Sequence, residues 1–196
     1  MKVSRSRWLI AAVSVLLLAS GSSVAATRPA TDLDRLTAQW WRWSISMPLA
    51  GHPLADPALD PTAEDCTFNQ RGKTWFLGGV FNTSGTVVRN CVVPRDVSLL
   101  VPAINVDCSN VEAPPFFGAT RRDRRACATG FEMSNPFAEL RGPGSNVSAL
   151  PVHYVVSPDF HFKGPDGNVL LVPGSISGRA VSAGWWTLIP PLRSGS

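Results

Sequence analysis

The sequence patterns of the commonest catalytic and cofactor sites are missing from this chain of 196 residues. There is no His-Glu-x-x-His motif and no glycine-rich phosphate loop. The nearest approach to Gly-x-Ser-x-Gly has Ile176 where the nucleophilic serine would stand. The 14 acidic residues include no pair that indicates a glycosidase, which needs two carboxylates on facing elements. We therefore predict no cofactor, and we favour a non-enzymatic protein over an enzyme.

Zinc-binding patterns are missing as well. The four cysteines, Cys66, Cys91, Cys108 and Cys127, form no Cys-x-x-Cys and no Cys/His spacing, so we predict no metal site. An even number of cysteines in an exported protein predicts two disulfides, for which three pairings are possible. We favour Cys66–Cys91 and Cys108–Cys127, because each closes a short local loop worth about 3 kcal/mol in the chain-entropy model.

Only the N-terminus has a long hydrophobic run. Three basic residues precede an apolar stretch over residues 8–19, and small residues follow up to Ala26. These are the three parts of a secretory signal. Twelve apolar residues rise only about 18 Å as a helix, against a hydrocarbon core of roughly 30 Å. We predict that residues 1–26 are a cleaved signal peptide, that no membrane span remains, and that the protein is secreted or periplasmic in a bacterial cell.

A large excess of basic charge is also missing once the signal is removed. Of the 18 basic residues three lie in the signal, which leaves 15 against 14 acidic ones. The pI of about 9.2 therefore does not indicate a nucleic-acid partner. One dense cluster remains, Arg-Arg-Asp-Arg-Arg at residues 121–125. We predict a solvated loop there, with contact to an anionic surface polymer as the alternative.

The remaining residues, 27–196, are expected to form a single disulfide-stapled domain. One helix is predicted over residues 33–47, opened by a capping box at Thr31 and Asp34 and stopped by Pro48. Its apolar stripe contains Leu33, Leu36, Trp40, Trp43 and Met47, and Trp41 lies on a flank. We expect this amphipathic helix to pack on one face of a sheet.

Short apolar segments between turns predict the strands. They cover residues 74–81, 86–93, 97–106, 152–156, 160–162, 169–172 and 185–189. The first two form a hairpin around a turn at 82–85, and Pro102 predicts a bulge or an edge in the third. Residues 107–144 are predicted to be a long, irregular loop. The fold class is therefore mainly β, as a sandwich or a jelly-roll-like barrel with one N-terminal helix.

Four residues are candidate ligand contacts. Trp185 and Trp186 are adjacent on a strand and must point to opposite faces, so one can be buried while the other offers a flat surface to a sugar. Asp159 and His161 are two residues apart on an extended segment and would share a face as an acid–base pair. For both pairs, core packing or an ordinary surface role is the alternative.

Several short motifs follow one another from about Trp40 to the C-terminus. They are Trp40-Trp41-Arg42-Trp43-Ser44-Ile45-Ser46-Met47-Pro48, Gln70-x-Gly72-x-x-Trp75-Phe76-Leu77-x-Gly79, Arg89-x-Cys91-x-Val93-Pro94, Leu99-x-x-Pro102-x-x-Asn105, Ser157-Pro158-x-Phe160-x-Phe162-x-x-Pro165-x-x-Asn168 and Gly184-Trp185-Trp186-x-Leu188-x-Pro190-Pro191-Leu192. In this order they resemble a family of uncharacterised secreted bacterial proteins with no established activity. The chain differs from that family at Trp185, where a tyrosine is expected, and it ends where the family continues, so we expect a truncated C-terminus. The resemblance implies secretion and supplies no mechanism.

Together these observations predict an exported, non-enzymatic binding domain whose partner is a polysaccharide or a protein of the cell envelope. An exported hydrolase with a dispersed active site and a structural envelope protein are the alternatives. The binding domain predicts a shallow groove with an exposed tryptophan, and the hydrolase predicts a deep polar pocket where His and carboxylate converge. The structural protein predicts an apolar patch or an open strand edge. The oligomeric state stays open.

Overall fold

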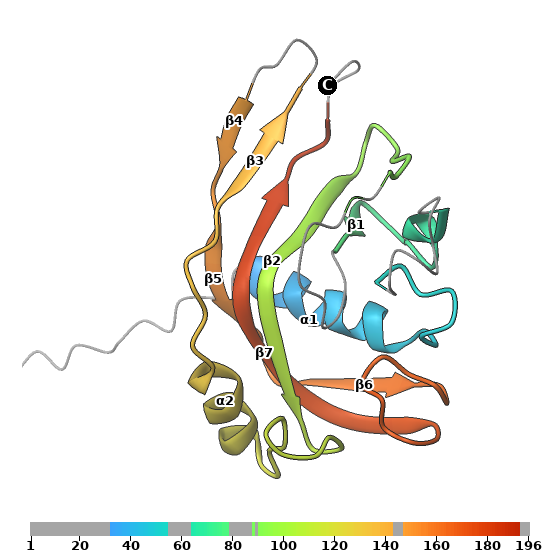
Figure 1. Cartoon of the computed structure of the whole chain (residues 1–196), viewed down its shortest axis with the longest axis vertical. Coiled ribbons are helices and arrows are strands. Elements are labelled where there is room, and N and C mark those ends of the chain that lie inside the picture. The colour runs from blue at the N-terminus through green and yellow to red at the C-terminus, as the bar shows by residue number, and fades with distance from the viewer. Residues whose placement is uncertain (1–31, 55–63, 79–87, 89, 143–146, 193–196) are drawn as a thin grey trace, which may run out of the picture.

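The computed structural model describes residues 32–54, 64–78, 88, 90–142 and 147–192 (Figure 1). The predicted signal peptide, the capping residue Thr31 and the hairpin turn at 82–85 lie outside the described residues. None of the helices in the described part of the chain is long and apolar enough to cross a membrane.

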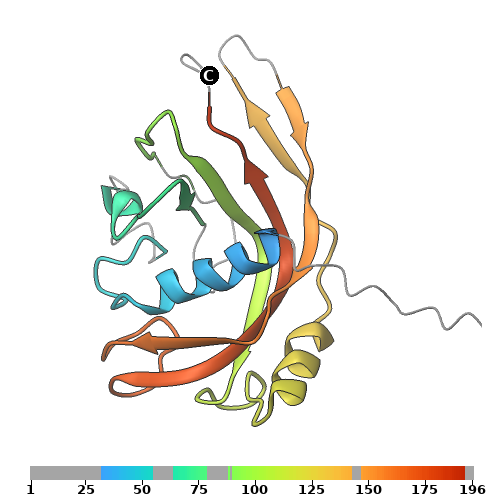
Figure 2. The same ribbon diagram turned by 180° about the vertical axis from the view of Figure 1, so that it is seen from behind.

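The molecule is mainly β, as predicted, and is built on one mixed, strongly curved sheet (Figures 1 and 2). Its strands are β1 Thr74–Phe76, β2 Ser98–Ser109, β7 Ile176–Ile189, β5 His153–Val156 and β6 Phe160–Gly164. β1 is parallel to β2, whereas β2, β5 and β6 are all antiparallel to β7. The two long central strands, β2 and β7, therefore pair with every other strand of this sheet. The sandwich or jelly-roll arrangement stays a prediction.

Helix α1, Asp32–Ile45, lies in the concave side of the sheet and packs on β5, β6 and β7 (Figure 2). One face of the helix is exposed at Asp32, Arg35, Gln39 and Arg42, four positions spaced by three or four residues. The other face carries Trp40 and Trp43 into the main core, where Trp40 meets the fully buried Trp186 edge to face at 5.4 Å. A helix at the predicted place and its contact with a sheet are confirmed, although the helix ends at Ile45 instead of Met47.

The pairing of β2 with β7 contains the irregularity that Pro102 predicts. The register shifts between Pro102 and Ile104, and Gly184 of β7 lies opposite Asn105 just beyond the shift. Gly184 has a φ of 157°, and a Cβ atom there would lie 2.4 Å from the Ile104 carbonyl oxygen. β2 is not an edge strand, because β1 and β7 flank it. At the bulge the backbones of β2 and β7 therefore lie too close together for a side chain at position 184.

Replacing Gly184 with alanine is expected to lower the free energy of unfolding by about 1–3 kcal/mol, because the new methyl group must push the bulge away. Denaturant unfolding followed by fluorescence measures this change. Gly130→Ala is the matched control, because the space around its Cβ position is open. Equal stabilities of the two variants would contradict the close approach.

The prediction of an irregular loop over residues 107–144 is wrong in three places, because β2 continues to Ser109 and a helix and a short strand form further along. Helix α2, Arg121–Gly130, forms where the charge cluster lies, with Thr120 and Asp123 as a reciprocal capping box. Strands β3, Ala138–Arg141, and β4, Val147–Leu150, pair as a separate two-stranded sheet. Helix α2 packs on the convex side of β2 and β7, opposite α1, so the sheet is covered by one helix on each face (Figures 1 and 2).

Other strand predictions are confirmed only in part. Within 74–81 the structure describes residues 74–78, of which only β1 is a strand, and the described residues of 86–93 form none. Residues 169–172 form a turn and coil instead of a strand. The strand expected at 185–189 is the end of the much longer β7. A short 3-10 helix, Glu64–Thr67, follows the connector after α1.

Both favoured disulfides are confirmed. Cys66 is bonded to Cys91 and Cys108 to Cys127, with a Cα–Cα distance of 6.0 Å in each pair. The second disulfide joins the end of β2 to α2 and closes the segment of residues 110–120 between them. That segment contributes Glu112 and Phe116 to the wall of a cavity.

Candidate ligand-binding cavity

A cavity of about 300 Å³ opens on the concave side of the sheet, next to the end of β2. Its walls come from α1, from β2 and from two connecting segments, and comprise Trp41, residues 105–107, Glu112, Phe116 and residues 169–171. Most of these side chains are apolar or aromatic, and two carboxyl groups lie among them. Its size is at the lower end of the range for small-molecule sites.

Asp107 is the buried acidic residue of the cavity. It is only 4% exposed, and its Oδ2 atom has no hydrogen-bond partner among the described residues. On the neighbouring strand the directly opposite residue is Ser182, which is fully buried and whose hydroxyl also lacks a described partner. Buried polar atoms without partners are rare because each costs about 1–3 kcal/mol. Asp107 and Ser182 place two such atoms at opposite positions on adjacent strands.

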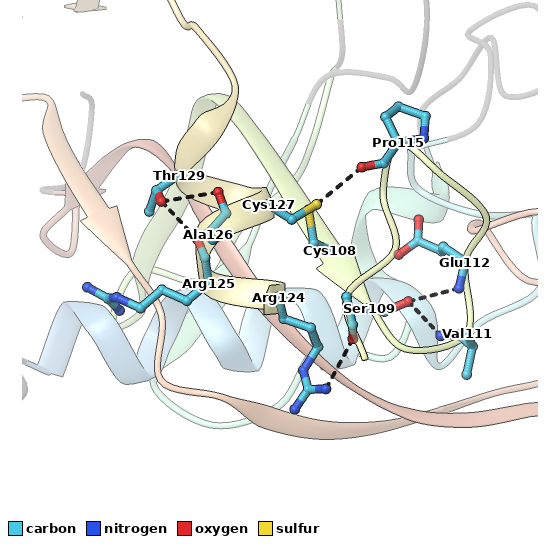
Figure 3. Close-up of a disulfide and its surroundings, with 11 residues drawn as sticks. Cys108, Ser109, Val111, Glu112, Pro115, Arg124, Arg125, Ala126, Cys127 and Thr129 are labelled. Carbon is cyan, nitrogen blue, oxygen red and sulfur yellow. Dashed lines mark hydrogen bonds between the residues drawn. A yellow bond between two sulfur atoms is a disulfide. The ribbon is translucent and has the colours of Figure 1, made fainter. Parts of the chain in front are cut away.

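Glu112 enters the cavity from the segment that the second disulfide closes (Figure 3). The Ser109 hydroxyl accepts hydrogen bonds from the backbone N–H groups of Val111 and Glu112, both at 3.2 Å, and so turns the chain sharply after β2. The Oε2 atom of Glu112 is buried and has no described partner either. Further along the segment, Phe116 stacks on Phe131 with 5.3 Å between ring centroids.

The two carboxyl groups hold protons more tightly than ordinary side chains. Burial raises the pKa of Glu112 to about 7, partly offset by the Ser109 hydroxyl. Burial and then the nearby charge of Glu112 raise the pKa of Asp107 well above its usual value. No basic side chain lines the cavity among the described residues. The two groups therefore influence each other's titration, and Glu112 is partly protonated at neutral pH.

A buried ion pair outside the cavity supports the segment of residues 110–120. The Arg124 side chain of α2 donates to the Asp159 carboxylate at 2.9 and 2.7 Å, and also to the carbonyl oxygens of Gly118 and Ala119. The second oxygen of Asp159 accepts from Arg179 at 2.6 Å. The side chains of Arg124 and Asp159 are 5% and 6% exposed. The prediction of a solvated charge cluster is therefore wrong for Arg124, which ties the 110–120 segment to the sheet.

The opposite wall is a turn organised by a buried amide. The side chain of Asn168 is fully buried and donates to the carbonyl oxygens of Pro165, Val172 and Gly174. This turn holds Leu171 at a φ of 56°, a left-handed conformation that a leucine rarely adopts, and leaves it 70% exposed beside the cavity. An exposed leucine at this place extends the apolar wall outward.

The predicted contact residues lie elsewhere. Asp159 binds Arg124 and Arg179, whereas the His161 ring contacts the Ser177 hydroxyl at 3.0 Å, so the structure does not bring the two together as an acid–base pair. Trp186 has no exposed surface. Trp185 is half-buried on the convex side, where it meets Tyr154 edge to face at 5.4 Å. Of the two tryptophans only Trp185 can offer a surface to a sugar, and this stays a prediction.

A second hollow, of about 370 Å³, lies beside the Cys66–Cys91 disulfide. Among the described residues its lining contains only apolar side chains, including Trp43, Phe76 and Leu99. It has no group that could orient a polar ligand, so the carboxylate-lined cavity is the better candidate. The described residues also contain no group of three His, Cys, Asp or Glu side chains that could hold a metal ion.

Comparison with known proteins adds no assignment: no protein-family model, no curated protein and no solved structure matches the chain. The resemblance to a secreted bacterial family therefore stays a prediction. The fold and the cavity together define the molecule only as a disulfide-bonded, mainly β protein with a carboxylate-lined cavity.

Neither carboxyl group of the cavity was predicted from the sequence. Asp107 and Glu112 are five residues apart, but they reach the same cavity only because the chain turns sharply at Ser109. The position of Asp107 could have been predicted from the strand pattern. Successive side chains of a strand point to opposite faces, so a strand that continues beyond Val106 places Asp107 on the same face as Asn105. An aspartate at such an inward position is rare without a partner.

Proposed function

We propose that this chain is an exported binding domain that takes a small molecule into the cavity between Asp107 and Glu112. The observation that carries the proposal is the Asp107 Oδ2 atom, which belongs to a buried residue that lines the cavity and has no hydrogen-bond partner among the described residues. Leaving such a group unpaired destabilises the fold, and strained or unsatisfied groups of this kind cluster at functional sites. A ligand that donates to the two carboxyl groups would satisfy them.

Export is part of the proposal and is supported by two features. The N-terminal 26 residues have the pattern of a signal peptide, and both disulfides form between the four cysteines. The proposed site of action is the periplasm or the outside of the cell. The partly exposed Trp185 supports a polysaccharide partner less well, because it stands beside a single tyrosine and lines none of the cavities described above.

A fragment screen followed by two-dimensional NMR tests the proposal. We expect ligands to shift the amide signals of residues 105–107, 112, 116 and 169–171 in the oxidised protein purified after export. Asp107→Asn removes the charge and keeps the shape, and it should weaken binding of such a ligand by about tenfold or more, the value of a hydrogen bond to a charged group.

The matched control is Glu132→Gln, which removes an exposed carboxylate outside the cavity and should bind normally. Trp185→Ala tests the competing surface. If ligands bind Asp107→Asn as tightly as the wild type but lose affinity for Trp185→Ala, the site is on the convex face and the proposed cavity is wrong.

A hydrolase that uses the same pair is a second candidate, favoured by the pKa of about 7 at Glu112. A carboxyl group that exchanges its proton near neutral pH is suited to general acid–base catalysis, and a second carboxylate nearby could share that work. Release of product from a panel of chromogenic glycosides and esters, lost in Glu112→Gln, would favour this function. Turnover that persists in Glu112→Gln would come from elsewhere in the protein.

A further inference from the structure

We infer that the ligand of this cavity is a small organic cation, an ammonium or guanidinium group on an apolar stem. This inference rests on the proposed function and names the class of molecule that the cavity would bind. Three observations support it: the acceptors that line the cavity, the absence of a cationic partner for them in the described residues, and the apolar and aromatic walls around them.

The protein itself shows how it accommodates a buried carboxylate. Asp159, with a side chain 6% exposed, holds two guanidinium groups, Arg124 on one oxygen and Arg179 on the other. Asp107 is buried to a similar degree, yet no arginine, lysine or histidine of the described chain lines its cavity. A buried charge is stable only when it is paired and hydrogen-bonded. A cationic ligand would supply this positive charge and so stabilise the ionised form of the carboxyl pair.

The polar groups of the cavity favour a ligand that donates hydrogen bonds. The unpartnered atoms of Asp107 and Glu112 are carboxyl oxygens, which accept hydrogen bonds when ionised. An ammonium or guanidinium group has only donors, so every contact it makes here is satisfied. An anionic ligand would meet two acidic groups without a basic residue and is excluded on the same grounds.

The apolar walls of the cavity suit the hydrocarbon stem of such a cation. The Trp41 and Phe116 rings line the cavity and can lie against a cation as well as against a hydrocarbon stem. Leu171, 70% exposed at the cavity, would cover the outer part of the stem. A free sugar has hydroxyl groups on all sides and would bury several of them against Val169, Leu170 and Leu171.

Binding of a cation changes the protonation of the pair. Asp107 and Glu112 are the titratable groups that face each other in the cavity, and the other described lining residues carry no charge. A bound cation favours the ionised carboxylates, so the proton that the pair holds at neutral pH leaves to the solvent. A neutral ligand of the same shape leaves the proton in place.

The experiment is calorimetry with n-alkylamines and n-alkylguanidines of four to eight carbons, each compared with the alkanol of equal length. We expect the cations to bind at least about tenfold more tightly than the alkanols, the value of one charge-assisted hydrogen bond. Titrations in buffers of different ionisation enthalpy should show release of up to one proton per cation bound at pH 7. Asp107→Asn should remove the preference for cations, while Glu132→Gln should keep it.

The outcomes separate this inference from the proposed function. If alkanols or neutral fragments bind the cavity as tightly as the amines, the site exists and the cation is the wrong ligand. If amines bind without proton release and with equal affinity to Asp107→Asn, their binding is not to the carboxyl pair, and the inference is overturned. If no neutral or charged compound shifts the signals of the cavity residues, the proposed function itself is wrong.

Discussion

Replacing Asp159 with asparagine is expected to lower the free energy of unfolding by about 3–5 kcal/mol, because Arg124 is then left buried without its counter-charge. A domain of this size has a total stability of about 5–15 kcal/mol, so the variant should be close to unfolding at 37 °C. Denaturant unfolding monitored by tryptophan fluorescence measures the change. The guanidinium of Arg124 would still donate to Gly118 and Ala119, but two carbonyl oxygens do not neutralise a buried cation.

Arg179→Gln is the matched control for this prediction. It removes the other partner of the same carboxylate, but the Arg179 side chain is 50% exposed and its contribution should stay below about 1 kcal/mol. The double variant Arg124→Met, Asp159→Leu should recover much of the lost stability, since it removes both buried charges together. If Asp159→Asn and Arg179→Gln have the same small effect, the pair does not stabilise the α2 side of the fold.

Asp159→Asn should also loosen residues 110–120, the segment of the cavity wall that contains Glu112. The Arg124 side chain donates to the carbonyl oxygens of residues 118–119 and so adds to the backbone hydrogen bonds by which Phe116 and Gly118 hold Ser109 of β2. Hydrogen exchange of amides in residues 110–120 should therefore quicken more than exchange in β6. The charge cluster thus supports the cavity from outside it.

The elements with strong hydrophobic patterns could be predicted from the sequence. Helix α1 follows from the spacing of its tryptophans, and β2 from its dense run of apolar residues. The disulfides follow from the preference for local loops, because Cys108 and Cys127 each lie in an element that packs on the other. In these places the local sequence and the tertiary contacts favour the same structure.

The missed elements have weak hydrophobic patterns. Helix α2 buries only Arg124 and Ala128, so its polar sequence resembles a loop, although its capping box of Thr120 and Asp123 was readable. The first half of β7 is rich in small residues such as Ala180 and Ser182, which leave room for the bulky side chains that α1 packs on the sheet. Such a strand is recognisable only when its partner is known.

The cavity could be predicted least of all, because its parts come from four separate places in the chain. Trp41 was expected on a flank of the helix, but its side chain is only 3% exposed, belongs to the same core as Trp43 and also lines the cavity. Residues 169–171 looked like a strand because they are apolar, but the buried amide of Asn168 bends them into a turn. Sites assembled in this way depend on tertiary packing rather than on local patterns.

The second large effect is a loss of stability as the pH rises. Burial raises the pKa of Glu112 from 4.5 in the unfolded chain to about 7 in the folded one, so the folded protein binds more protons than the unfolded one between these values. Stability therefore falls with increasing pH across this window, by about 3 kcal/mol from Glu112 alone, and the raised pKa of Asp107 acts in the same direction. Denaturant unfolding at a series of pH values from 4.5 to 8 measures the slope.

Asp159 determines how the free energy of unfolding changes with pH at the acidic end of this range. Burial opposes its ionisation, but the hydrogen bonds and charges of Arg124 and Arg179 outweigh this and hold its pKa below the usual value. The stability that Asp159 contributes is present at pH values above the pKa of an unfolded aspartate, about 3.9, and is lost as the pH falls through the lowered pKa of the folded state. The protein should therefore be most stable between about pH 4 and 5, well below neutrality.

Glu112→Gln identifies the group responsible for the loss at higher pH. The amide cannot ionise, so the variant should match the wild type at pH 4.5 and exceed its stability by about 2–3 kcal/mol at pH 8, with a flatter profile between. The exposed Glu132→Gln should follow the wild-type profile throughout. A wild-type stability that stays constant from pH 4.5 to 8 would mean that the carboxyl pair is solvated in solution. If instead the slope disappears in Glu112→Gln together with ligand binding, the side chain that weakens the free fold is the one that the ligand needs.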